Sequence, residues 1–435
     1  MRRKTVRSLL ILLVVGALGF LVACGSSGTP VGVTPPPPPG QNIQPISVNG
    51  GPLGNYANGA FVSVEICLPG TTTCQTINDV LVDTGSVGLR LLASQVTINP
   101  PVLNDGNGDN LNNCIQFLDG SFLWGDVAQA DIKMAGEVAS STSVQLIANP
   151  TGGYLIPPGC TGINETTQQT LDANGILGVG PEPFDCGPGC DPVANAGGTP
   201  PPVYYLCSAN TGCVATFVPC GNVCQDTQAA NAQITNPVFN FTGDNNGVIL
   251  QLPSLASAAA TVSGSLIFGI GTQSNNTLGS AAVLLLNSSD EFTTSFSGQL
   301  LTSSFIDSGS NGLFFPNGIE TGFAGDTIPV CTDNTSFYCP ATLTPFSATN
   351  ESGSTNSAVN FSVDNSDNLS TQNPGDFAFV NLGGPLGSGA CNATSNPTAC
   401  SFDFGLPFFY GRSVFTAIDG AVAPTGVPAG PFVAY

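Results

Sequence analysis

Residues 80–86 read Val-Leu-Val-Asp-Thr-Gly-Ser, and residues 304–310 read Ser-Phe-Ile-Asp-Ser-Gly-Ser. In both stretches an apolar segment runs into Asp, then Thr or Ser, then Gly-Ser. One such stretch alone is weak evidence, because most isolated copies are turns. Two copies form a repeat, and a repeat constrains the fold far more strongly than a single turn does.

An apolar residue and a glycine follow each copy at nearly the same distance. Gly178 lies 95 residues after Asp83 in Gly-Ile-Leu-Gly, and Gly405 lies 98 residues after Asp307 in Asp-Phe-Gly. Because the order and the spacing both recur, the pattern indicates a gene duplication. We therefore predict two related halves, each carrying one aspartate loop.

The paired loops predict an acid–base site built from Asp83 and Asp307. Two carboxylates a few ångströms apart cannot both ionise cheaply, so one keeps its proton while the other stays charged. The charged member can take a proton from a water held between them, while the neutral member hydrogen-bonds a substrate carbonyl. Gly85 and Gly309 let the two loops approach closely.

The rest of the chain predicts a mostly β protein. Short apolar runs such as 60–66, 79–82, 247–252 and 265–268 are separated by Gly, Asn, Pro and Ser, without sustained helical periodicity. The length favours two β lobes, each with its own core. We expect a signal at 1–24, a Pro/Gly/Ser-rich spacer at 25–47, lobes at 48–180 and 246–435, and a Cys-rich interlobe insertion at 181–245.

These motifs resemble the pepsin family of bilobal aspartic proteases. Besides the aspartate loops, residues 172–180 resemble the family's Asp-Gly-Ile-Leu-Gly-Leu-Gly element, residues 264–269 resemble the strand that opens its second half, and residues 404–419 resemble its final segment. The resemblance extends from about Phe61 to the C-terminus, interrupted by the insertion. It implies an all-β, bilobal pepsin-like fold and an aspartic endopeptidase that needs no cofactor, with Asp83 and Asp307 as catalytic residues.

The resemblance also implies roles for the neighbouring residues. Thr84 and Ser308 would cross-link the two loops through their hydroxyls, and Ser86 and Ser310 would hydrogen-bond the outer carboxylate oxygens. A substrate-covering hairpin, the flap, is expected at residues 117–125, including Phe117, Gly120, Ser121 and Trp124. Phe117 stands where the family has a tyrosine. Trp124 either substitutes for that tyrosine or anchors a core.

Composition excludes several other chemistries. The chain has no histidine, which removes Ser-His-Asp and Cys-His catalysis. Without histidine or paired C-x-x-C spacing, a zinc site is not expected, and no metal or cofactor is predicted. After the N-terminal signal the chain has 28 acidic residues and only three basic ones, so its negative charge would repel nucleic acid. We predict a monomer acting on a peptide or protein substrate.

The N-terminus predicts export and lipid anchoring. Four of the chain's seven basic residues precede an apolar run at 8–23, which ends at Cys24. This order resembles a bacterial lipobox, in which the cysteine is lipidated after cleavage; an ordinary secretory signal with a chance cysteine is the alternative. The prediction is an exported bacterial lipoprotein, held on a cell-envelope membrane by its lipid and facing the periplasm or the cell surface.

The cysteines predict a disulfide framework in such an exported chain. Setting Cys24 aside leaves 14 of the 15 cysteines, and several lie close in sequence. Sequence alone does not fix the connectivity, but local bridges are favoured over long-range ones. The candidate pairs are Cys67 with Cys74, Cys186 with Cys190, Cys331 with Cys339, and Cys391 with Cys400.

Three questions stay open from the sequence. Arg90 could pair with a substrate carboxylate or with a structural acid. Residues 105–109 could form a calcium loop or a polar turn, although position twelve is Gln116 rather than glutamate. The fold could also serve as a catalytically silent surface module that binds peptides or proteins, or the chain could be a structural lipoprotein with an unrelated β-sandwich.

Overall fold

The computed structural model describes residues 42–148, 155–208, 212–220, 231–317, 327–386 and 400–435. The predicted lipid site at Cys24, the spacer up to residue 41 and the candidate bridge partner Cys391 lie outside these ranges. Strand β1 already begins at Ile43, inside the stretch predicted as spacer. No helix among the described residues is both long and apolar enough to cross a membrane.

The described chain is built almost entirely from strands, which confirms the predicted all-β fold class. In the first half these are β1 (Ile43–Asn49), β2 (Gly59–Cys67), β3 (Cys74–Asp83), β4 (Val87–Leu92), β5 (Asn110–Gln116), β6 (Ser121–Met134), β7 (Glu137–Ile147), β8 (Ile163–Asn164), β9 (Gly175–Val179), β10 (Tyr204–Ser208) and β11 (Gly212–Ala215).

The second half contains β12 (Gly247–Gln251), β13 (Val262–Phe268), β14 (Val283–Leu285), β15 (Phe292–Phe296), β16 (Gln299–Ile306), β17 (Leu313–Phe315), β18 (Thr344–Ser352), β19 (Thr355–Val363), β20 (Gly383–Pro385), β21 (Asp403–Phe404), β22 (Ser413–Ala417) and β23 (Phe432–Ala434). In the described parts of both halves together, the α-helices are α1 (Gln168–Leu171) and α3 (Ser366–Gln372). Short 3-10 turns are η1 (Ala93–Gln95), η2 (Gly187–Cys190), η4 (Pro237–Asn240) and η6 (Leu406–Phe409).

Four strands around each aspartate loop follow the same plan in both halves. In the first, β3 runs parallel to β9, β9 antiparallel to β4, and β4 parallel to β7. In the second, β16 runs parallel to β21, β21 antiparallel to β17, and β17 parallel to β20. The duplicated sequence motif therefore corresponds to a duplicated strand arrangement, as in the bilobal pepsin-like fold.

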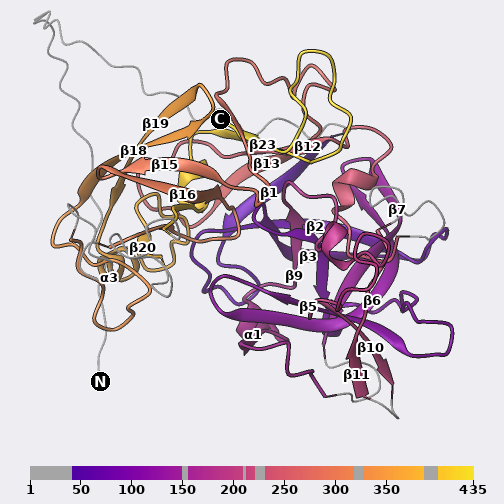
Figure 1. The fold of residues 1–435 in the computed structure, drawn as a ribbon. Coiled ribbons are helices and arrows are strands. Elements are labelled where there is room, and N and C mark those ends of the chain that lie inside the picture. Colours follow the sequence, from indigo (N-terminus) through magenta and orange to yellow (C-terminus); the bar gives the residue numbers. More distant parts are fainter. Residues whose placement is uncertain (1–41, 149–154, 209–211, 221–230, 318–326, 387–399) are drawn as a thin grey trace, which may run out of the picture. The chain divides into compact units, whose positions relative to one another are not determined.

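Strand β1 joins the two halves. It pairs with β2 on one side and with β13 on the other, so residues near the N-terminus form a sheet with residues more than 200 positions later. Figure 1 shows the indigo β1 beside β13 and β12, with the first half on one side and the orange β15, β16, β18 and β19 on the other. A break in this sheet would disturb both halves at once.

The Cys-rich stretch 181–245, predicted as an interlobe insertion, extends the sheet of the first half. Within it, β10 pairs with β5 over Tyr204 to Cys207, and β11 pairs with β10. Residues 203–207 form a short apolar run of the kind found in buried strands, although the cysteines and prolines nearby obscured it in the sequence. The stretch thus packs against the first half.

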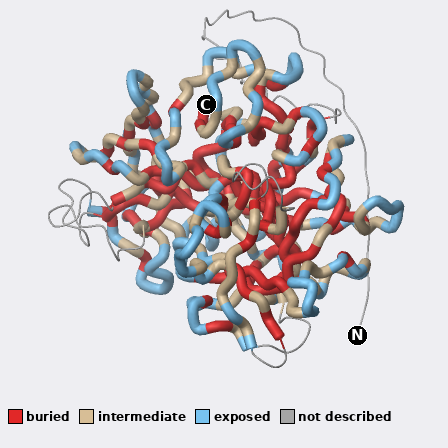
Figure 2. The backbone as a smooth tube through the Cα atoms, turned by 45° about the vertical axis from the view of Figure 1, so that its right-hand side comes forward, coloured by how far each residue is buried: buried red, intermediate tan, exposed pale blue. Residues whose placement is uncertain are grey.

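The core lies along the strands that carry the aspartate loops. Figure 2 shows the buried backbone in the interior and the exposed backbone in the connecting turns. In the second half the core is largely aromatic: the rings of Phe402 and Phe404 stack 4.0 Å apart, and Phe315 and Phe361 pack on Phe402. Such aromatic packing fixes the strand that runs next to the second loop.

The disulfides are mostly local, as predicted. Cys67–Cys74, Cys186–Cys190 and Cys331–Cys339 confirm three candidate pairs, and Cys207–Cys213 closes a fourth short loop. Cys114–Cys160 departs from the expectation of local bridges, because its partners lie 46 residues apart. Cys220 and Cys400 are also disulfide-bonded.

Candidate active site

Both aspartates stand at strand ends that glycines allow to meet. Asp83 is the last residue of β3 and lies opposite Gly178 of β9, and the Asp307 N–H donates to the Phe404 carbonyl of β21. A Cβ on Gly85 would lie 2.6 Å from Cγ of Asp307, and one on Gly309 would lie 2.8 Å from Cγ of Asp83. No larger residue fits, so the glycines are required for the close approach.

The glycines of the apolar-Gly motifs have a similar role behind the loops. A Cβ on Gly178 would lie 2.6 Å from backbone atoms of Val87, and one on Gly405 would lie 2.1 Å from the Gly312 carbonyl oxygen. Each loop backbone therefore crosses directly over a glycine of the neighbouring strand. This explains why the apolar-Gly motif follows each aspartate loop in the sequence.

Thr84 and Ser308 cross-link the two loops symmetrically. The Thr84 N–H donates to Ser308 Oγ at 3.1 Å, and the Ser308 N–H donates to Thr84 Oγ1 at 2.9 Å. Each hydroxyl in turn donates to a carbonyl of the opposite half, Thr84 to Ile306 at 3.3 Å and Ser308 to Val82 at 2.7 Å. Both side chains are buried, so these bonds hold the loops together away from water.

Each carboxyl group is oriented by its own loop. The Gly85 N–H donates to Asp83 Oδ1 at 2.8 Å, and the Gly309 N–H donates to Asp307 Oδ1 at 2.7 Å. The Ser86 hydroxyl donates to Asp83 Oδ2, and the Ser310 hydroxyl donates to Asp307 Oδ2 at 2.8 Å. The two sets of donors are equivalent, so the two carboxyl groups are oriented in the same way relative to their own loops.

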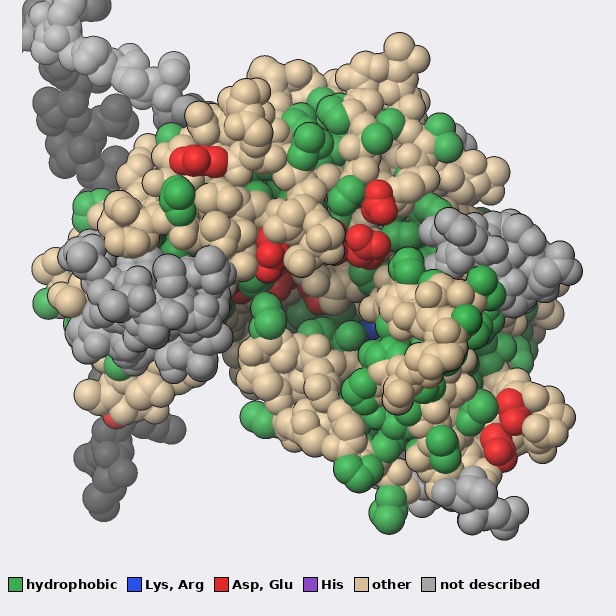
Figure 3. Space-filling model, viewed as in Figure 1, with side chains coloured by type: hydrophobic (Ala, Val, Ile, Leu, Met, Phe, Trp, Pro, Cys, Tyr) green, Lys and Arg blue, Asp and Glu red, His purple; other side chains and the backbone are tan. Residues whose placement is uncertain are grey.

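The two carboxyl groups meet where the loops touch: a Cβ on Gly309 would lie 2.8 Å from Asp83 Oδ1 and 3.2 Å from Asp307 Oδ1. Burial, followed by the negative charge of Asp307, raises the pKa of Asp83 well above its usual range. One proton is therefore held by the two groups as a pair. On the face shown in Figure 3, Asp and Glu side chains gather at a hollow in the surface. A carboxylic acid beside a carboxylate can give and accept protons in the same step.

The predicted flap is a hairpin of β5 and β6. Its turn comprises Phe117 to Gly120, with the Phe117 N–H donating to the Ser121 carbonyl at 2.9 Å and Gly120 at φ +85°. Asp119 Oδ1 accepts the Ser121 N–H at 2.8 Å, which fixes the turn. The Phe117 ring packs against the apolar cluster that contains Ile176. The substrate contacts of Phe117, Gly120 and Ser121 remain predictions.

Trp124 does not fit its predicted place among the substrate-binding residues. It is fully buried in a cluster with Phe122, Tyr205 and the Cys114–Cys160 bridge, and its ring meets Tyr205 edge-on at 5.5 Å. On β6 it pairs with Cys114, well inside the hairpin. The structure therefore supports the core-anchor alternative, because strand alternation turns this side chain into the packed interior.

Two polar groups near the carboxyl pair had no role in the sequence analysis. The Tyr56 hydroxyl donates to the Gly309 carbonyl at 3.4 Å, and burial and the charges of Asp307 and Asp83 raise its pKa. Asp403 lies buried on β21, and burial and the negative charge of Asp307 raise its pKa well above the usual range. The sequence contained a signal for Asp403, because this acid belongs to the second apolar-Gly motif and stands there in place of an apolar residue. Tyr56 carried no comparable signal.

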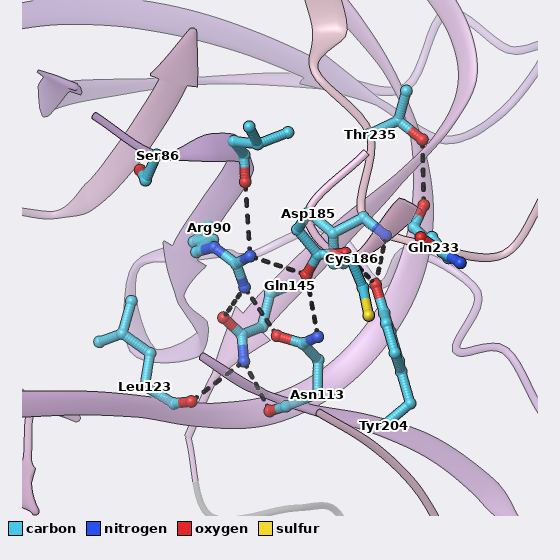
Figure 4. A network of polar contacts seen from close by, with 12 residues as sticks. Ser86, Arg90, Asn113, Leu123, Gln145, Asp185, Cys186, Tyr204, Gln233 and Thr235 are labelled. Atoms are coloured by element: carbon cyan, nitrogen blue, oxygen red, sulfur yellow. Dashed lines mark hydrogen bonds and ion pairs between the residues drawn. The ribbon is translucent and has the colours of Figure 1, made fainter. Parts of the chain in front are cut away.

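Arg90 belongs to a buried polar network behind the first loop (Figure 4). Its Nη2 lies 2.9 Å from Asp185 Oδ2, and both side chains are almost fully buried. Its Nη1 donates to Asn113 and Gln145, each at 2.7 Å. This confirms the pairing of Arg90 with a structural acid.

Residues 105–109, the other open question, form a polar turn, because the Asp105 carboxylate accepts the backbone N–H groups of Asn107 and Asp109.

Comparisons with known proteins add the following. No match is found among curated proteins. Among solved structures, the chain is similar to the aspartic proteinase from Irpex lacteus, with 14% sequence identity, coverage of 86% of this chain and 93% of that chain, and a TM-score of 0.44. The family model described as "Protein of unknown function (DUF3443)" matches residues 38–435. The chain therefore belongs to the DUF3443 family.

Proposed function

We propose that this protein is an aspartic endopeptidase that cleaves extended peptides between its two halves. The observation that carries the proposal is the close approach of the Asp83 and Asp307 carboxyl groups, each held by equivalent donors from two duplicated loops. An inert cleft has no need of two acidic groups that face each other, since bringing them together costs free energy.

The chemistry follows from the shared proton. The ionised carboxylate removes a proton from a water molecule between the two groups, and the water oxygen attacks the carbonyl carbon of the peptide bond. The protonated carboxyl group gives its proton to the carbonyl oxygen as the tetrahedral intermediate forms. Collapse of the intermediate breaks the C–N bond: the proton taken from water passes to the leaving nitrogen, and one hydroxyl of the intermediate returns its proton to the carboxyl pair, which restores the site. No side-chain nucleophile is needed.

The test is digestion of an unfolded protein by the full chain between pH 3 and 7, with and without a statine-type inhibitor. We expect cleavage that is strongest in the acidic part of this range and that the inhibitor removes. Cleavage that the inhibitor leaves unchanged would point to a contaminating protease. If no cleavage occurs at any pH while the protein is folded, the endopeptidase proposal is wrong.

A binding protein without turnover is the second candidate. The supporting observation is Phe117, which provides no hydroxyl at the turn of the hairpin where pepsin-like enzymes have a tyrosine. The same assay separates the two functions. A binding protein would retain the statine-type inhibitor in an equilibrium binding measurement but would leave the unfolded substrate intact.

We also propose that the protein is an exported bacterial lipoprotein that acts as a monomer at the periplasmic or outer surface of a membrane. Basic residues, an apolar run and small residues before Cys24 support lipid attachment. We expect a bacterium expressing the full chain to incorporate labelled fatty acid into it, and Cys24→Ala to abolish the label. Labelling of the variant at the wild-type level would contradict the anchor.

A cluster of acids predicts that the fold is more stable in mild acid than at neutral pH. Burial and the charges of Asp290 and Asp419 raise the pKa of Glu182 to about 7, and burial raises the pKa of Asp290 to about 6. The native state therefore binds protons that the unfolded chain, with ordinary pKa values of 4.5 and 3.8, has already released. Stability must fall as pH rises through this window.

We expect the melting temperature, measured by circular dichroism, to be higher at pH 4.5 than at pH 7.5. Glu182→Gln with Asp290→Asn should reduce the difference, because neither amide titrates. Asp333→Asn, at an exposed position, should keep it. A melting temperature that is equal or higher at pH 7.5 in the unmodified chain would contradict this prediction.

A further inference from the structure

The turn between β1 and β2, residues 50–58, contacts both halves of the molecule. Within the first half, Asn55 Nδ2 donates to Asp172 Oδ1 at 3.4 Å. Toward the second half, the Asn58 N–H donates to the Phe377 carbonyl at 2.6 Å. The turn belongs to the first half by its strands, yet its last residue bonds to the backbone of the second.

The Asn58 side chain uses its full hydrogen-bonding capacity, and every partner lies in the second half. Its Nδ2 donates to the carbonyls of Asn311 and Phe379, each at 2.8 Å. Its Oδ1 accepts the Phe379 N–H at 2.7 Å and the Tyr410 hydroxyl at 3.0 Å. An amide offers two donor hydrogens and an oxygen that accepts two bonds. The side chain is fully buried, so water does not compete for these bonds.

Two bonds from the turn reach the carbonyl groups on either side of Ser310. The Asn311 carbonyl, which accepts from Asn58, follows Ser310 in the chain. The Gly309 carbonyl, which precedes Ser310, accepts from the Tyr56 hydroxyl at 3.4 Å. The backbone of the second aspartate loop is therefore held from the first half on both sides of this serine.

The equivalent carbonyl of the first loop is held differently. Val87 follows Ser86 as Asn311 follows Ser310. The Val87 carbonyl accepts from Arg90 Nη2 at 3.4 Å, and both residues lie on β4 of the first half. The duplication is therefore broken at this point: the first loop is held by its own half, whereas the second loop depends on a residue of the other half.

These bonds bear on the orientation of a catalytic carboxyl group. The Ser310 hydroxyl donates to Asp307 Oδ2 at 2.8 Å, so the backbone position of Ser310 sets the direction of this bond. We propose that Asn58 is a positioning residue that, with Tyr56, latches the second aspartate loop to the first half. The latch keeps the Asp307 carboxyl group facing that of Asp83. Its effect on catalysis rests on the proposed function.

The latch and the loop cross-link hold opposite ends of the second loop. The bonds between Thr84 and Ser308 attach the loop directly after Asp307. Asn58 attaches it three residues further on, at Asn311. A loop that is attached at one end can pivot about that end, whereas attachment at both ends fixes its direction. Removing the latch should therefore loosen the loop without separating the two halves.

Three variants separate the latch from general stability. Asn58→Gly removes the side chain without straining the backbone, because φ is +55° at this residue and Gly adopts such values freely. Asn246→Gly is the matched control: this buried amide bonds to the N–H and carbonyl of Ile270, at 2.8 and 2.9 Å, inside the second half. Tyr56→Phe removes one hydroxyl and keeps the ring that packs edge-on against Phe61.

The first measurement is hydrogen exchange by NMR, which requires no catalysis. We expect the backbone amides of Thr84 and Ser308 to exchange at least about tenfold faster in Asn58→Gly and about threefold faster in Tyr56→Phe, relative to the paired amides of β6 and β7. Asn246→Gly should leave this ratio unchanged, because it releases no bond between the halves. An unchanged ratio in Asn58→Gly and Tyr56→Phe would overturn the proposal, whether or not the protein is an active protease.

The second measurement is steady-state cleavage of a peptide substrate in acid. We expect Asn58→Gly to lower kcat about 10- to 100-fold, with KM within about twofold, because a small displacement of a reacting group acts on the chemical step. Asn246→Gly should keep kcat within about twofold. A raised KM with unchanged kcat would place Asn58 in substrate binding and would contradict the positioning role. If exchange changes as expected but even the unmodified chain cleaves nothing, the latch stands and only the proposed function falls.

Discussion

Replacing either Asp83 or Asp307 by Asn is expected to lower kcat/KM about 10⁴- to 10⁶-fold, the scale seen when one member of a catalytic unit is lost. An amide cannot take a proton from water, and it cannot deliver one to a carbonyl oxygen. Because the two carboxyl groups share one proton, they act as a unit. The double variant should therefore be hardly worse than either single variant.

Stability distinguishes lost chemistry from lost folding in these variants. Burial and the charge of Asp307 oppose ionisation of Asp83, so Asp83→Asn should unfold at the same or a higher temperature at neutral pH. The exposed control Asp333→Asn should leave both activity and melting temperature unchanged. A single variant that is folded and keeps more than about a tenth of the activity would exclude a catalytic pair.

The aspartate loops were predictable because the residues that their chemistry requires lie next to one another in the sequence. Asp-Thr-Gly-Ser and Asp-Ser-Gly-Ser each specify a carboxylate, two hydroxyls and a glycine within four residues. The duplicated order then predicts that the two loops meet. The crossed hydrogen bonds of Thr84 and Ser308 and the donors of Ser86 and Ser310 match the arrangement that the resemblance implied.

Residues that act across long sequence distances were not predictable in this way. Tyr56 meets Gly309 only because β1 and β2 bring the first half against the second, 253 residues later. Cys114 and Cys160 are brought together by the fold of the hairpin and are not close in the sequence. The role of Trp124 stayed open between flap and core because it depends on the face of β6 that the side chain occupies, which becomes clear only from its packing with Tyr205.

Arg90→Met is expected to destabilise the protein by about 3–5 kcal/mol, the usual cost of removing one partner of a buried ion pair. The loss of Arg90 would leave the Asp185 carboxylate in the interior with only Asn113 and Tyr204 as donors. Burial already raises the pKa of Asp185, and the charge of Arg90 opposes that shift. Without Arg90 the acid should take up a proton or draw in water, and either process costs stability.

The matched control is Arg90→Met combined with Asp185→Asn, which removes both charges. Urea unfolding should show that this double variant recovers most of the loss, because the remaining amide can still accept from Tyr204 while no unpaired charge stays buried. A loss below about 1 kcal/mol in Arg90→Met would mean that the pair is not buried in solution. Equal losses in both variants would mean that Arg90 acts through packing and its bonds to Asn113 and Gln145, rather than through its charge.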